Sequence, residues 1–117
     1  MGHWHDVQND LRDPARDLRS MIPDTYAGFA ALHKGAMGDG EISGAMKEVI
    51  ALAIAVVERC DGCIAAHARG AARKGATREQ VAEGIGVAIL MTGGPGTVYG
   101  PRAWEAYLEF LADQPST

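Results

Sequence analysis

The sequence predicts an all-α protein, and three observations favour this class. Alternating runs of β-branched or aromatic residues, which would indicate strands, are absent from the 117 residues. Ala, Glu, Arg, Met and Leu, which suit helices, dominate the chain. Apolar residues recur at helical spacing between breaks that contain Gly or Pro. We therefore expect a single domain over residues 1–117 with about six helices.

The first three helices have clear boundaries. Pro23 restarts the chain after a polar first helix, and the turn cluster GDGE at 38–41 ends the second. Ser43 is a plausible N-cap for the third helix. The six helices are expected at about residues 4–20, 24–37, 43–58, 62–74, 77–91 and 97–112.

The third predicted helix has an unusual composition. Its centre, VIALAIAVV at 49–57, is apolar on every side. Such a helix has to be covered on all sides, and one chain of this length supplies few helices to do so. We therefore expect a neighbouring subunit to cover part of it.

The second half of the chain also carries boundary signals. Asp61-Gly62 can cap and bend the chain, so a helix break is expected there. Gly75 resembles the glycine that follows a helix C-terminus. Thr77-Arg78-Glu79-Gln80 fits a capping box that opens the fifth helix. The stretch 92–96, TGGPG, is expected to form a loop before the last helix.

Composition and charge exclude several classes of protein. A net charge of −4 without a Lys/Arg stripe argues against binding nucleic acid through its phosphates. The apolar run 49–57 is too short to cross a bilayer, and the polar N-terminus does not resemble a secretory signal. The expected location is the cytoplasm.

The two cysteines, Cys60 and Cys63, are the strongest chemical signal. They are three residues apart, whereas the disulfide framework of a secreted mini-protein uses several dispersed cysteines. A redox cysteine reacts as its thiolate, and the free N–H groups and dipole at a helix start favour that charge. The break at Asp61-Gly62 places Cys63 in the first turn of the next helix. His67 lies one turn further along the same face and can accept the thiol proton.

A carboxylate that orients His67 would improve it as a base. Glu48, Glu58 and Glu41 are the candidates, and helical spacing alone does not choose between them because the chain bends between 58 and 62.

Zinc binding is an alternative for the same residues. Cys60, Cys63 and His67 supply three ligands, and Glu48 or His33 could supply a fourth. However, structural zinc sites usually bring a second ligand pair, which is missing here. If it does not bind metal, His33 is expected on a helix surface or at an interface. The segment His3-Trp4-His5 is expected to be a solvated chain end.

The motif as a whole resembles that of a known family. Glu48, eleven residues, Cys60-Asp61-Gly62-Cys63, three residues and His67 match the E-x11-C-x-x-C-x-x-x-H signature of AhpD-like alkylhydroperoxidases, in the carboxymuconolactone decarboxylase superfamily. The similarity continues through 74–77 and 93–95 and covers about residues 20–112.

The resemblance implies an AhpD-like bundle in which subunits interlock, commonly as a homotrimer or homohexamer. It implies that Cys63 attacks a peroxide or disulfide, that Cys60 resolves the adduct, and that His67 and Glu48 relay protons. A cellular dithiol or redox protein would then reduce the pair, in an antioxidant role, and no cofactor or metal is expected.

One departure concerns Gly62, where peroxidases of the family often have histidine or an aromatic residue. The glycine lacks the side chain that could carry a proton there, and it is expected to leave the pocket more open. Two alternatives remain: a cofactor-free decarboxylase or isomerase that uses His67 and Glu48 as acid and base, and a zinc-binding or assembly module.

Overall fold

The computed structural model describes residues 2–115 and confirms the predicted class. This part of the chain contains six helices and no strand. The helices are α1 (His3–Met21), α2 (Pro23–Met37), α3 (Gly44–Glu58), α4 (Asp61–Arg73), α5 (Arg78–Thr92) and α6 (Gly94–Leu111).

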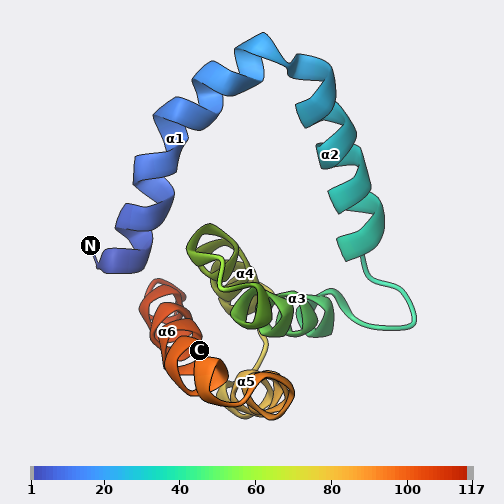
Figure 1. The fold of residues 1–117 in the computed structure, drawn as a ribbon. Helices are drawn as coiled ribbons and strands as arrows, with labels where there is room; N and C mark the ends of the chain where they lie inside the picture. The colour runs from blue at the N-terminus through green and yellow to red at the C-terminus, as the bar shows by residue number, and fades with distance from the viewer. Residues whose placement is uncertain (1, 116–117) are drawn as a thin grey trace.

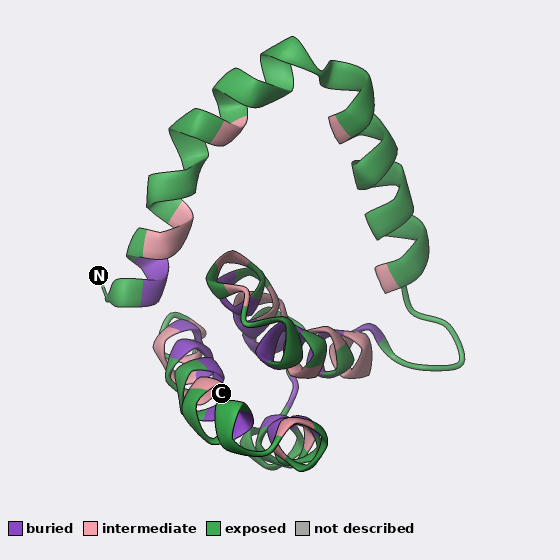
Figure 2. Ribbon diagram, in the orientation of Figure 1, coloured by how far each residue is buried: buried purple, intermediate pink, exposed green. Residues whose placement is uncertain are grey.

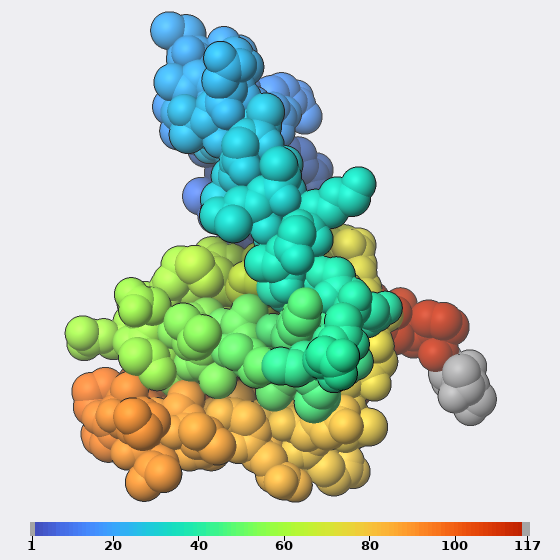
Figure 3. Space-filling model, turned by 90° about the vertical axis from the view of Figure 1, so that its right-hand side faces the viewer, coloured from blue at the N-terminus to red at the C-terminus, as the bar shows by residue number. Residues whose placement is uncertain are grey.

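The helices form two parts of different character (Figure 1). Helices α3 to α6 pack into a bundle in which α4 lies against both α3 and α6. Helices α1 and α2 form an arch that rises from the bundle and returns to it. Turned by 90°, the molecule shows α2 standing above the bundle surface (Figure 3). Within the described residues, no helix combines the length and hydropathy needed to cross a membrane.

The hydrophobic core lies almost wholly within the bundle (Figure 2). Small side chains of α4 let its neighbours approach closely, and larger side chains from α3 and α6 fill the space around it. Helix α2 contributes no buried residue. The largest fully buried side chains are Trp4, Tyr107, Phe110, Leu52, Ile64, Val56 and Val81.

Local capping explains where the bundle helices begin and end. The Ser43 hydroxyl accepts the Met46 N–H at the start of α3, as predicted. Thr77 and Gln80 form the predicted capping box at the start of α5. Gly75 follows α4 with φ +83°, a conformation that glycine adopts without steric cost.

The predicted loop at 92–96 is wrong. Helix α5 continues to Thr92 and α6 already begins at Gly94, so Gly93 alone makes the turn. Its φ of +67° reverses the chain in one residue. Pro95 is tolerated in the first turn of α6, because those N–H groups have no partner within the helix.

The expectation of a solvated N-terminal end is also wrong. Trp4 is fully buried and donates its indole N–H to Glu105 Oε1 at 2.8 Å. His5 is 9% exposed and lies between two carboxylates, with Nδ1 on Glu109 and Nε2 2.6 Å from Asp113 Oδ2. The Trp4 and His5 backbone N–H groups also bind the Glu109 carboxylate. These contacts fasten the first turn of α1 to the end of α6.

The charge state of His5 follows from this arrangement. A carboxylate only accepts hydrogen bonds, so both ring nitrogens must carry a proton. Hydrogen bonds to Asp113 and Glu109 raise the pKa of His5 above 6.5, despite an opposing effect of burial. Burial acts to raise the pKa of Glu109, but its hydrogen bonds from His5 and Trp4 lower it overall.

The stability of this contact should therefore fall as pH rises. The contribution of His5 is complete below its unfolded pKa of about 6.5 and is lost as pH rises through the raised folded pKa. Urea unfolding of wild type and His5→Gln should be measured between pH 6 and 9. The free energy of unfolding of wild type should fall over this range, and this fall should be missing in the variant. His3 is exposed and provides the control, since His3→Gln should keep the wild-type dependence of stability on pH. Equal slopes in all three proteins would contradict the account.

Candidate functional site

Cys60 occupies the junction between α3 and α4. The backbone N–H of Arg59 binds Val56 O and that of Cys60 binds Ala55 O, which are the two bonds of a Schellman motif. The backbone of Arg59 adopts the left-handed helical conformation, with φ 55°, and turns the chain sharply. Cys60 then caps α4, because its Sγ accepts the Cys63 N–H at 3.2 Å. The break therefore consists of Arg59 and Cys60, two residues earlier than the predicted Asp61-Gly62, and Cys60 is the cap in place of Asp61.

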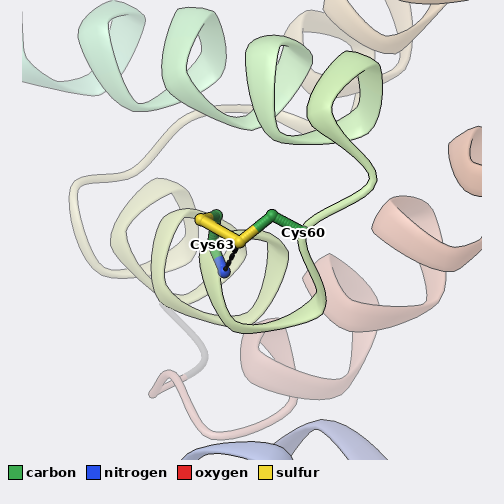
Figure 4. Close-up of a disulfide and its surroundings, with 2 residues drawn as sticks. All are labelled: Cys60 and Cys63. Carbon is green, nitrogen blue, oxygen red and sulfur yellow. Dashed lines mark hydrogen bonds between the residues drawn. A yellow bond between two sulfur atoms is a disulfide. The ribbon is translucent and has the colours of Figure 1, made fainter.

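Cys63 lies in the first turn of α4, as the sequence predicted. Its Sγ is joined to Cys60 Sγ in a disulfide that spans a Cα–Cα distance of 5.2 Å (Figure 4). Cys63 is exposed, whereas Cys60 is partly buried. The more exposed cysteine is therefore the one nearer to His67 in sequence.

His67 and Glu48 form a hydrogen-bonded pair between α4 and α3. His67 Nδ1 lies 2.8 Å from Glu48 Oε1, and Glu48 is only 5% exposed. Because the carboxylate accepts, Nδ1 carries the proton and donates it. Nε2 is thereby left to exchange protons with a reacting group. The pair has the arrangement of a base with its orienting carboxylate.

The three candidate carboxylates are now distinguished. Only Glu48 binds His67, whereas Glu41 is exposed in the connection between α2 and α3. Glu58 lines a cavity of about 210 Å³ together with Cys63 and His67. The rest of that cavity is apolar and consists of Ala51, Ile54 and Ala55. Cys63 and His67 thus line one largely apolar cavity.

His33 was expected on a helix surface, and it is exposed on α2. The arch nevertheless places its ring nearly parallel to that of His67, with centroids 6.4 Å apart. This proximity depends on how α2 returns to the bundle, and local sequence carried no signal for it. No cluster of three or more His, Cys, Asp or Glu side chains suited to a metal ion occurs among residues 2–115.

Helix α1 closes the space beside Gly62. The missing side chain was expected to open the pocket, but Leu11 Cδ1 would lie 3.3 Å from a Cβ at this position. The side of the helix start that faces α1 is therefore occupied by an apolar group of the arch.

Gly70 is a site residue that the sequence reasoning missed. A Cβ at this position would overlap Oε2 and Cδ of Glu48, so the absent side chain provides the space for the carboxylate. A signal existed, because glycine in the middle of an Ala-rich helix costs about 0.5–1 kcal/mol relative to alanine. That cost is explained by the close approach of Glu48.

Gly70→Ala should destabilise the protein by about 1–3 kcal/mol, because overpacking outweighs the gain in helix propensity. Urea unfolding measures this change. Gly86→Ala is the matched control, since Gly86 is exposed within α5 and a Cβ there meets nothing within 4 Å. The control should be neutral or slightly stabilised.

Shortening the carboxylate side chain should relieve the overlap. Adding Glu48→Asp to Gly70→Ala is expected to recover part of the lost stability, whereas Glu48→Asp alone should not stabilise the protein. If Gly70→Ala matched Gly86→Ala in stability, the carboxylate would not occupy this space.

The site and the fold together define an all-α protein with a cysteine pair at a helix N-terminus and a His–Glu pair one turn away. The family model described as "Carboxymuconolactone decarboxylase family" matches residues 23–106. The chain belongs to this family, which confirms the resemblance seen in the motif.

The chain is similar to curated proteins in sequence and to a solved structure in fold. The chain is 43% identical over 89 residues to an uncharacterised protein of Cupriavidus necator, covering 76% of this chain and 78% of the relative. It is 41% identical over 75 residues to uncharacterised protein 4 in the cox locus of Paracoccus denitrificans, covering 64% and 68%. The crystal structure of an apo carboxymuconolactone decarboxylase family protein from Legionella pneumophila superposes with a TM-score of 0.89 at 35% identity, covering 92% and 96% of the two chains.

Proposed function

We propose that the protein is a thiol-dependent peroxidase or disulfide oxidoreductase. The observation that carries the proposal is the Cys60–Cys63 disulfide at the start of α4, one turn from the His67–Glu48 pair. A helix N-terminus stabilises a thiolate, and a neighbouring imidazole can accept its proton. Cys63 is the proposed attacking residue because it is exposed and shares a cavity with His67.

The peroxide reaction begins with the reduced pair. The Cys63 thiolate attacks the distal oxygen of ROOH, which breaks the O–O bond and gives a sulfenic acid and RO⁻. His67, protonated at Nε2 by the Cys63 thiol, returns that proton to RO⁻ and releases ROH. The Cys60 thiol then attacks the sulfenic sulfur, forming the disulfide and water.

The oxidised pair must then be reduced. A cellular dithiol attacks the disulfide, becomes oxidised to its own disulfide, and returns both cysteines to thiols. With a disulfide substrate, the same pair would carry two electrons in the same way. A reducing compartment such as the cytoplasm supplies such dithiols, and we place the protein there in an antioxidant role.

A non-redox acid–base enzyme, a decarboxylase or isomerase, is the second candidate. It is favoured by the completeness of the His67–Glu48 pair, which forms without any contribution from the cysteines. The two candidates differ in whether turnover depends on sulfur.

Peroxide consumption with a dithiol donor should require both parts of the site. Cys63→Ser is expected to abolish turnover, and Cys60→Ser to stop it after one sulfenic acid forms, which mass spectrometry detects. Glu48→Gln should reduce the rate by about 10²-fold or more, as for loss of an acid–base group. Turnover by Cys60→Ser/Cys63→Ser would instead support the acid–base enzyme. Stoichiometric zinc on the reduced pair would support a metal module.

We also propose that the protein is a homo-oligomer, a trimer or hexamer. Several large apolar side chains of the arch and of α3 face solvent in one chain, including Phe29 at 64% and Ile54 at 55% exposed. Apolar surface on this scale is typical of subunit interfaces. Analytical ultracentrifugation should give a mass three or six times the 12.3 kDa of one chain, and Phe29→Asp should lower this mass. A wild-type monomer at micromolar concentration would contradict this proposal.

A further inference from the structure

A second cavity lies beside the His67–Glu48 pair, beneath the arch. Its volume is about 330 Å³, and its walls come from α1, α2, α3 and α4. The wall contributed by α4 and its C-cap residue contains His67, Gly70 and three basic side chains, Arg69, Arg73 and Lys74. His67 also lines the apolar cavity at Cys63, so the two cavities meet at its ring.

The charge of this cavity differs from that of the chain as a whole. The net charge is −4, yet the cavity is lined by three basic side chains and a single carboxylate, Glu48, which is bound to His67. Within residues 2–115, none of the three cations lies within 4.0 Å of a carboxylate oxygen.

Of these three side chains, Arg69 is engaged in other contacts, whereas Arg73 and Lys74 are available to bind an anion. Arg69 donates to Gln8 Oε1 at 2.7 Å and lies over the Phe110 ring. Lys74 makes only a long contact of 3.4 Å to Met37 O. Arg73 is exposed and has no such contact. Lys74 also lines a neighbouring cavity together with Asp39, whose Oδ1 accepts the Gly44 N–H at 2.6 Å.

The spacing along α4 relates the cations to the reactive sulfur. At 1.5 Å per residue, Arg69 lies about 9 Å and Arg73 about 15 Å from Cys63 along the helix axis. An extended chain advances about 1.2 Å per bond, as three backbone bonds span about 3.6 Å. About twelve bonds therefore separate a group at the sulfur from one at Arg73, compared with about eight for Arg69. Apart from Glu58, the wall beside Cys63 and His67 is apolar and suits the intervening chain.

We propose that the substrate is an amphipathic organic acid that places its peroxide or disulfide at Cys63 and its carboxylate at Arg73 and Lys74. This inference rests on the proposed function, since it names the substrate class of the same site. Charge-assisted hydrogen bonds from Arg and Lys to a carboxylate are the strong kind, and both side chains are exposed and so accessible to a substrate.

Matched substrates test the proposal. The probe is 10-hydroperoxydecanoic acid, compared with its methyl ester, in a steady-state assay with a dithiol donor. Wild type should prefer the acid in kcat/KM by about tenfold, the effect of one charge-assisted contact. Arg73→Gln and Lys74→Gln should each bring the acid-to-ester ratio towards one. The control Arg102→Gln removes an equal charge on α6, where Arg102 lies over Tyr99, and should keep the ratio.

A binding measurement separates failure of this inference from failure of the proposed function. The ring protons of His67 report binding of 10-hydroxydecanoate, with uncharged 1,10-decanediol for comparison. Tighter binding of the acid, lost in Arg73→Gln and Lys74→Gln, supports the anion site even if neither peroxide is consumed. Equal binding of acid and diol, equal turnover of acid and ester, or a ratio insensitive to both variants would overturn it.

Discussion

The hydrogen bond between Glu48 and His67 determines how the rest of the site is built. A glutamate whose side chain is only 7% exposed requires a partner, because burial of its carboxylate without one is costly. Helix α4 provides the partner at His67 and the space at Gly70, one turn further on. The two-residue junction at Arg59 and Cys60 sets α4 against α3 so that these positions meet. The close packing of α3 and α4 and the chemistry of the site therefore depend on the same contact.

Much of the fold could be predicted because its signals are local. Ser43, Gly75 and the Thr77–Gln80 box each act within one helical turn, and each was identified correctly. The junction at 92–96 was not, because TGGPG is compatible both with a loop and with a one-residue turn followed by a proline-containing first turn. Local composition does not distinguish these; the packing of α5 on α6 does.

The site likewise combines features that local sequence predicts with features that depend on distant contacts. Spacing placed Cys60, Cys63 and His67 at one helix start, whereas the choice of Glu48 relied on the family motif, because helical spacing does not describe the bend before α4. His33 and the partners of His5 are more than 30 residues distant from the groups they meet. Such contacts follow from the path of the arch, and a single sequence carries little information about it. Gly70 had a local signal, its cost to an Ala-rich helix.

The account requires that the reduced Cys63 be a thiolate at neutral pH, held by the helix start and by His67. The direct measurement is the rate of Cys63 alkylation against pH in the reduced protein, with the modified residue identified by mass spectrometry. We expect a midpoint well below about 8.5, the value for a free thiol, and a higher midpoint in His67→Ala. A midpoint at or above 8.5 that does not respond to His67→Ala would contradict the account.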